Sequence, residues 1–264
     1  MIDGVGAVHY ATSRDGSAIG YRQAGIGPVI VDAAVMGTSI RMRDLYSSAG
    51  QGVRAIAGVT LVTYDQRGIG YSDRDSDDCS MDAMVNDLAA VVDTLGCAQV
   101  IISAGWSHGP IAMRYAAEFP DRVSHLILNS TSANGADLFE DVPMLGFMHA
   151  GLKTDWDIFV TLCCRVALNL DHPRSDEVEA VMRQEASQDA LLRHWDAISS
   201  YDASPWLGSI SSPTLLMQRT GIAAQASVHD SMRQLAKAIP NSALVRSESG
   251  ADTDRQVQEF IGTP

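Results

Sequence analysis

Short apolar runs alternate along the chain with segments in which apolar residues recur every three or four positions. The runs predict buried strands, and they lie at 28–31, 60–64, 99–103 and 123–129. The periodic segments predict amphipathic helices, and they span 81–95 and 111–119. Ser80 precedes the first helix as a candidate N-cap, and Gly96 follows it as a stop signal. Because strands alternate with helices, the chain predicts an α/β fold with a mostly parallel central sheet flanked by helices.

Further strands and helices are predicted before and after these elements, and one long helical segment interrupts the alternation. Residues 7–24 predict two short strands joined by a turn at Arg14-Asp15-Gly16. From about 133 to 206 the strand-like runs stop and helical spacing takes over. The alternation resumes with a strand-like segment at 212–217, a helix at 228–239, a strand at 243–245 and a helix at 254–261. We therefore expect a core made of residues 1–132 and 207–264, with a helical cap inserted at 133–206.

The sequence Gly105-Trp106-Ser107-His108-Gly109 lies between a predicted strand and a predicted helix. A serine bracketed by small residues at such a point is typical of a sharp turn that forces strained backbone angles on the serine. In parallel sheets, ligands bind at the carboxyl ends of the strands, where this turn is expected. Ser107 is therefore a candidate catalytic residue. The alternative is a tight turn with an incidental serine.

Several segments together resemble the α/β-hydrolases, over nearly the whole chain. They are Tyr64-Asp65-Gln66-Arg67-Gly68-Ile69-Gly70-Tyr71-Ser72-Asp73, the turn at Ser107, Phe119-Pro120-Asp121-Arg122-Val123, and Pro213-Thr214-Leu215-Leu216 with Leu235-Ala236-Lys237-Ala238-Ile239-Pro240. The resemblance implies the α/β-hydrolase fold with an inserted helical cap. It also implies a nucleophile elbow at Ser107, and an oxyanion hole made by the N–H of His108 and an N–H of Ala34 or Val35.

The same resemblance locates the two partners that a serine nucleophile needs. Ile222 stands where the family places its aspartate, and Thr253 or, less plausibly, Ala251 stands where it places its histidine. No carboxylate occurs from 213 to 229, and no histidine follows His229. A serine without its base loses on the order of 10⁶-fold in turnover. We therefore expect that ester hydrolysis by the usual relay fails.

Other residues are candidates to replace the missing base. Asp32 lies close to the expected oxyanion loop and is a candidate general acid or base, with a structural or surface role as the alternative. His149, His172 and His194 lie in the expected cap, which overhangs the elbow in this family, and any one of them could reach the serine. Solvated cap histidines are the alternative. Of these we single out His194 and Asp32 as tentative catalytic residues.

Charge and cysteine content limit the range of partners. The formal net charge of −13 repels phosphate backbones and anionic lipid surfaces, so neither nucleic acid nor membrane is an expected partner. The chain has four cysteines without a CxxC spacing, and we expect no metal and no cofactor. No segment approaches the roughly 18 apolar residues of a membrane span, and no basic leader opens the chain. A soluble protein in a reducing, cytoplasmic compartment is the expectation.

Three functions remain open. The leading one is an enzyme that acts on a small, largely apolar, carbonyl-containing metabolite through Ser107 and the oxyanion region, in a cyclisation, elimination or isomerisation rather than hydrolysis. The second is an ester, thioester or lactone hydrolase with a relocated base. The third is a non-catalytic protein that binds a small ligand. Trp106 and Met36 are candidates to line the pocket in each case, although such residues more often belong to the core.

Overall fold

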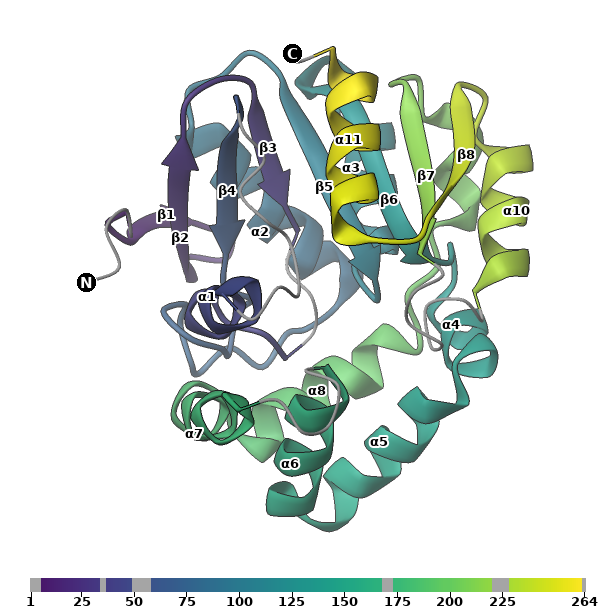
Figure 1. The fold of residues 1–264 in the computed structure, drawn as a ribbon. Coiled ribbons are helices and arrows are strands. Elements are labelled where there is room, and N and C mark those ends of the chain that lie inside the picture. Colours follow the sequence, from purple (N-terminus) through teal and green to yellow (C-terminus); the bar gives the residue numbers. More distant parts are fainter. Residues whose placement is uncertain (1–5, 34–36, 49–57, 168–172, 220–227, 263–264) are drawn as a thin grey trace.

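A mostly parallel sheet forms the centre of the protein (Figure 1). The structure is a computed structural model that describes residues 6–33, 37–48, 58–167, 173–219 and 228–262. The sheet has eight strands in the order β1-β2-β4-β3-β5-β6-β7-β8. They span His9–Thr12 (β1), Ala18–Gly25 (β2), Val29–Asp32 (β3), Thr60–Tyr64 (β4), Val100–Trp106 (β5), Val123–Thr131 (β6), Thr214–Arg219 (β7) and Ser242–Ser247 (β8).

The pairing of the strands confirms the predicted fold class. β1 and β2 form an antiparallel hairpin, and β2 also pairs antiparallel with β4. The pairs β3–β4, β3–β5, β5–β6, β6–β7 and β7–β8 are parallel. Gly16 has a φ of 93° in the hairpin turn, where the sequence predicts a turn residue. The carboxyl ends of the parallel strands consequently meet at one edge of the sheet.

Helices cover both faces of this sheet, as the α/β pattern predicts. They span Ile40–Ser48 (α1), Met81–Thr94 (α2), Gly109–Glu118 (α3), His229–Ala238 (α10) and Gly250–Ile261 (α11). The apolar side of α11 packs on one face against β3, β5 and β7, whereas α2, α3 and α10 pack on the other (Figure 1). The side chain of Ser80 caps α2 by accepting the N–H of Ala83, which confirms the predicted cap. The sequence pattern did not predict α1.

Five consecutive helices intervene between β6 and β7, and we call them the inserted helices. They span Gly135–Asp141 (α4), Pro143–Thr154 (α5), Trp156–Ala167 (α6), Ser175–Glu185 (α7) and Gln188–Ile198 (α8). Figure 1 shows them across the edge at which β5 and β6 end. Trp195 of α8 lies at their centre, with its ring centroid 5.8 Å from those of both Phe139 and Phe159. The boundaries of a separate cap domain stay a prediction.

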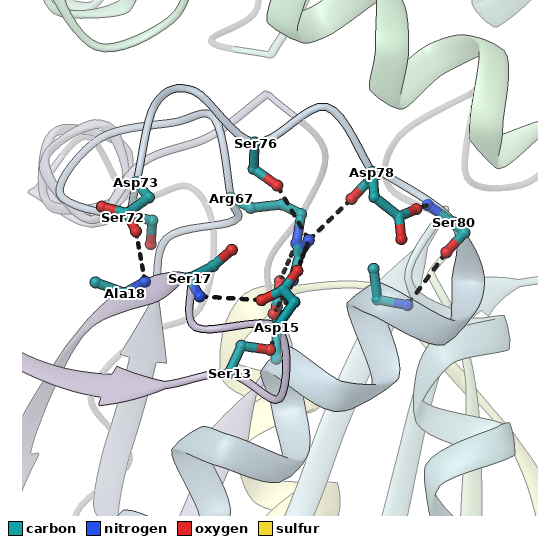
Figure 2. A network of polar contacts seen from close by, with 12 residues as sticks. Ser13, Asp15, Ser17, Ala18, Arg67, Ser72, Asp73, Ser76, Asp78 and Ser80 are labelled. Carbon is teal, nitrogen blue, oxygen red and sulfur yellow. Dashed lines mark hydrogen bonds and ion pairs between the residues drawn. The ribbon is translucent and has the colours of Figure 1, made fainter.

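The guanidinium of Arg67 fixes the loop that follows β4. Its side chain is fully buried and pairs with both carboxylate oxygens of Asp87 on α2, at 2.8 and 2.6 Å. It also donates to Asp15 in the β1–β2 turn, to the hydroxyl of Ser76 and to the carbonyl of Asp78 (Figure 2). A guanidinium has five N–H donors in a fixed fork, so these partners hold it in one orientation. The hairpin, α2 and the β4–α2 loop are therefore tied at one point.

The same loop is bonded to the inserted helices. The N–H of Gly70 donates to the carbonyl of Glu185 at the end of α7, at 2.8 Å. The Nε2 of His194 on α8 donates to the carbonyl of Arg67, also at 2.8 Å. Arg41 of α1 pairs with the side chain of Glu185 at 2.8 Å. The Arg67 network thus also determines where the inserted helices lie over the sheet edge.

None of the helices in the described ranges combines the length and the apolar character that spanning a bilayer requires.

Replacing Asp87 by asparagine tests the importance of the Arg67 network. The variant leaves the Arg67 charge buried without its main counter-charge, because both side chains of this pair are 0% exposed. We expect the free energy of unfolding to fall by about 3–5 kcal/mol in urea denaturation. The control Glu259→Gln removes an exposed carboxylate paired with Arg255 and should cost less than about 0.5 kcal/mol. Equal effects of the two substitutions would contradict the assignment.

Candidate functional site

The turn at the predicted motif strains Trp106 rather than Ser107. β5 continues as far as Trp106, whose φ is +52°, and α3 begins at Gly109. Among the non-glycine residues that the structure describes, only Trp106 and Ser130 have a positive φ. This region costs an L-residue about 1–2 kcal/mol. The prediction that Ser107 carries the strained backbone is therefore wrong, because the strained residue is its neighbour Trp106. The strand runs beyond its predicted end at residue 103, and Ser107 already belongs to the turn into α3.

The strained turn is packed tightly against β6. A Cβ atom on Gly105 would lie 2.8 Å from the carbonyl oxygen of Asn129, and one on Gly109 would lie 2.1 Å from the hydroxyl oxygen of Thr131. The same hydroxyl donates a hydrogen bond to the carbonyl of Trp106. Only glycine fits at these two positions, and the neighbouring strand therefore holds Trp106 in its left-handed conformation.

The backbone donor at this turn also differs from the expected one. The N–H of His108 donates to the carbonyl of Gly105 at 3.1 Å, so it is not free to bind an oxyanion. The expectation for His108 is thus corrected, because its N–H closes the turn. The N–H of Ser107, which directly follows the strained residue, donates to no acceptor in the described part of the chain. Ala34 and Val35, the candidates for a second donor, lie outside the described residues.

The hydroxyl of Ser107 faces a histidine from a buried position. Ser107 is only 2% exposed, and its Oγ lies 3.0 Å from Nδ1 of His108. The other ring nitrogen, Nε2, contacts the side-chain amide of Gln66, whose oxygen has no other partner. Both groups are satisfied when His108 Nε2–H donates to the Gln66 oxygen, since the two ends of an amide have the same outline. In that arrangement the Ser107 hydroxyl donates a hydrogen bond to Nδ1 of His108.

The imidazole of His108 is uncharged in this setting. Burial holds its pKa well below the ordinary 6.5, and the nearby His194 and Arg43 lower it further by electrostatic repulsion of the protonated form. A base with a strongly depressed pKa takes up a serine proton poorly. The Ser107–His108 pair is accordingly suited to fixing the turn and not to generating a nucleophile.

Asp32 ends β3 in an ion pair. Its carboxylate accepts a hydrogen bond from Arg43 at 2.9 Å, and Arg43 also donates to the carbonyl of Tyr64 at 3.2 Å. Burial raises the pKa of Asp32 to about 6, against the lowering effects of Arg43 and of a hydrogen bond from Ser103. The structure shows no hydrogen bond between Asp32 and Ser107. Its catalytic role stays a prediction.

The histidines of the inserted helices have other partners. His194 is 1% exposed and bonded through Nε2 to the carbonyl of Arg67, as described above, and burial lowers its pKa to about 4. Its Nδ1 is buried without a hydrogen-bond partner. His149 lies 2.8 Å from the carboxylate of Asp196. His172 lies outside the described residues. The structure thus places His194 near His108 without bonding it to Ser107.

The two positions that the resemblance assigned to the relay carry no acid or base in this sequence. Thr253 lies in the first turn of α11, where its hydroxyl donates to the carbonyl of Ser249 at 3.0 Å and contacts the hydroxyl of Ser247. Ile222 lies outside the described residues. In the described ranges, no group of three histidine, cysteine, aspartate or glutamate side chains is arranged to hold a metal ion.

Of the two residues predicted to line the pocket, the structure describes only Trp106. Trp106 is partly buried and packs against the main apolar cluster, whereas Met36 lies outside the described residues. A cleft of about 180 Å³ lies beside Arg67 and is lined by Ser13, Asp15 and Asp78, among others. Those side chains serve the network of Figure 2, so we do not assign this cleft to the candidate site.

Sequence reasoning missed three residues at or near the site, namely Gln66, Arg43 and Arg219. Gln66 contacts His108 across 42 positions of sequence, and only the loop resemblance that contains it offered a signal. Arg43 lies in α1, which the pattern did not predict. Arg219 ends β7, and the sequence pointed only to the lack of a carboxylate in its neighbourhood.

Comparison with known proteins agrees with the observed fold. Residues 43–158 match a family model described as alpha/beta hydrolase fold. Among similar solved structures is a bromoperoxidase from Bacillus anthracis, with a TM-score of 0.79, 18% identity, and coverage of 97% of this chain and 100% of that chain. An esterase from Exiguobacterium antarcticum has a TM-score of 0.77 and 17% identity, with coverage of 97% of this chain and 100% of that chain. An enol-lactonase from Burkholderia xenovorans LB400 has a TM-score of 0.74 and 20% identity, with coverage of 96% of this chain and 100% of that chain. At these identities the likeness concerns the fold.

Because the pKa of His194 is lowered, the free energy of unfolding should depend on pH. The substitution His194→Gln should remove this dependence. Between pH 6.5 and 4 the unfolded chain binds a proton at His194 that the folded chain does not. Stability therefore falls as the pH falls through this window, by about 3 kcal/mol for a pKa of about 4. His194→Gln keeps an N–H donor for the carbonyl of Arg67 but cannot be protonated.

Urea unfolding of both proteins at a series of pH values between 7 and 4 measures this effect. The wild type should lose about 3 kcal/mol more than His194→Gln, since distant groups contribute equally to both and cancel. Arg233→Gln, an exposed substitution, serves as the control and should follow the wild type. Parallel curves for the wild type and His194→Gln would show that the buried imidazole is not the cause.

Proposed function

Because this chain has the α/β-hydrolase fold, we propose that it is an atypical enzyme of that fold that binds a small, largely apolar, carbonyl-containing metabolite at the carboxyl edge of the sheet. It works without the Ser-His-Asp relay, so its reaction is a cyclisation, elimination or isomerisation and not an efficient hydrolysis. One observation carries the proposal. The strained position of the turn holds Trp106, and the hydroxyl of the neighbouring Ser107 is buried against an uncharged histidine.

A strained serine at the elbow is what exposes a nucleophile in this fold. Trp106 has no nucleophilic atom, and its bulky indole occupies the side-chain direction that the elbow presents. Ser107 lies one residue further along, where its side chain is 2% exposed. An acyl intermediate on Ser107 would need that hydroxyl to reach a bound carbonyl and to lose its proton. Neither its burial nor the depressed pKa of His108 favours those steps.

The backbone of the turn retains a different capability. The N–H of Ser107 is available for a ligand oxygen, and it follows a residue whose conformation is fixed by β6. A preorganised donor of this kind polarises a carbonyl and stabilises negative charge on its oxygen. The hydroxyl of Ser107 supports the site indirectly through its bond to His108. Trp106, which packs against the main apolar cluster, supplies apolar surface next to the donor.

A hydrolase with a relocated base is the second candidate, because the Ser107 hydroxyl lies within 3.0 Å of an imidazole nitrogen. A non-catalytic binding protein is the third, since the features at the turn also suit binding alone. The three candidates differ in what they do to a serine-directed reagent and to a metabolite.

A fluorophosphonate probe separates the first candidate from the second. We expect no labelling of the wild type, and hydrolysis of p-nitrophenyl butyrate at the rate of Ser107→Ala, because the hydroxyl is buried and its base is weak. Ser107→Ala and Trp106→Phe serve as matched variants, with intact-protein mass spectrometry and absorbance as the readouts. Rapid labelling that Ser107→Ala abolishes would overturn the proposal in favour of a serine hydrolase.

Metabolite extracts incubated with the protein in ¹⁸O-labelled water separate catalysis from binding. The proposal predicts a product that forms with the wild type and lacks ¹⁸O from the solvent, and that forms much more slowly with Trp106→Ala. A product that gains one solvent oxygen would indicate hydrolysis. Retention of an unchanged metabolite by the protein would indicate binding alone.

A further inference from the structure

Arg219 combines partial burial with an unpaired side chain, unlike the other arginines that the structure describes. Within the described ranges, only Arg14, Arg74 and Arg219 make no side-chain hydrogen bond or ion pair, and the first two are exposed. Arg219 is half-buried at the end of β7. The chain carries an excess of thirteen negative charges, so acidic partners are plentiful elsewhere on the molecule. An unpaired, half-buried guanidinium therefore requires a separate explanation.

Hydrogen bonds connect Arg219 to the strained turn. Its backbone N–H donates to the hydroxyl of Ser130 at 3.1 Å, and Ser130 is the second non-glycine residue with a positive φ. The next residue, Thr131, pairs with Trp106 and donates its hydroxyl to the Trp106 carbonyl. β5, β6 and β7 are adjacent, and neighbouring strands lie about 4.8 Å apart. The Cα atoms of Arg219 and Trp106 are thus roughly 10 Å apart at one edge of the sheet.

The electrostatic setting of Arg219 is unfavourable in the free protein. Burial lowers the pKa of Arg219, and the charge of Asp254 on α11 opposes this effect. A guanidinium that gives up water gains stability only when its fixed donors meet acceptors. Within the described ranges, none of the five N–H donors of the Arg219 guanidinium meets an acceptor.

A second polar group next to this position lacks a partner. The side-chain oxygen of Asn129 on β6 is buried without a hydrogen bond. Asn129 pairs with Met217, which lies two residues before Arg219 on β7 and on the same face of the sheet. Buried polar atoms in folded proteins almost always have partners. An amide oxygen accepts from a donor such as a water, and with the amide rotated by half a turn its N–H would donate to a ligand oxygen instead.

We propose that Arg219 binds the carboxylate of the ligand, which makes that ligand a small, largely apolar carboxylic acid with a further carbonyl group. The inference rests on the proposed function, because it places this ligand at the same sheet edge as the free N–H of Ser107. A guanidinium binds a carboxylate through two parallel hydrogen bonds, which fix the orientation of the ligand as well as its distance. The carboxylate anchors one end of the ligand, and its reactive carbonyl faces the turn.

Calorimetric titration with matched anionic and neutral probes tests this binding site. The probes are hexanoate and phenylacetate, with hexanamide and phenylacetamide as the neutral counterparts of equal shape. We expect the wild type to prefer each acid over its amide, and Arg219→Gln to bind the acids about ten- to hundredfold more weakly with no change for the amides. Arg219→Lys keeps the charge but loses the fork, so it should show an intermediate affinity.

Arg246→Gln is the matched control. Arg246 lies on the adjacent strand β8, is exposed, and contacts His229, so its substitution should leave the preference for acids intact. A preference for acids that persists in Arg219→Gln, or no preference in the wild type, overturns the inference. Neither result affects the serine labelling experiment, and the failure of this inference is therefore distinct from the failure of the proposed function.

A structural role for Arg219 makes a different prediction. If its charge serves only to offset Asp254, Arg219→Gln should lower the free energy of unfolding, and the added substitution Asp254→Asn should restore it. The inference instead expects Arg219→Gln to unfold at the same or a higher denaturant concentration, because an unpaired charge is removed. A destabilised and rescued variant that binds the acids normally would overturn the carboxylate site.

Discussion

The buried guanidinium of Arg67 is the constraint on which the candidate site depends. It joins the β1–β2 turn, α2 and the β4–α2 loop through charge-assisted hydrogen bonds that use all of its donor directions. The preceding residue, Gln66, contacts His108, and the carbonyl of Arg67 itself accepts the hydrogen bond of His194. A displacement of this loop would therefore move the first turn of α3 and the inserted helices together. The ion pair positions the site without contacting it.

Next to that anchor, the titratable side chains closest to Ser107 are uncharged or already paired. His108 and His194 are buried and neutral near pH 7, and Asp32 is paired with Arg43. Proton transfer needs a group whose pKa lies near the working pH, whereas polarisation of a carbonyl needs only a fixed donor in a water-poor setting. Burial moves the pKa values of the two histidines away from neutral pH but raises that of Asp32 to about 6. It also strengthens the interaction of a fixed donor with a ligand oxygen. The proposed non-hydrolytic reaction relies on that fixed donor.

The fold was predictable from the sequence because its strands and helices have clear apolar periods, and because the turns carry Gly16, Ser80 and Gly96. The site was less predictable. The motif around Ser107 is symmetric in small residues, so the sequence alone does not tell whether the strand ends before or after Trp106. A shift of one residue changes which side chain occupies the strained position. The contact between Gln66 and His108 joins loops far apart in sequence, and no local pattern encodes it.

The strain of the turn is held by packing. Gly105 and Gly109 let the turn approach β6, and the hydroxyl of Thr131 holds the carbonyl of Trp106. Together these contacts outweigh the roughly 1–2 kcal/mol that a left-handed tryptophan costs. A serine at the strained position would gain nothing from them unless a base also reached it. A Gly-x-Ser-x-Gly sequence therefore predicts the sharp turn, but it does not by itself locate the strained residue, which here is Trp106.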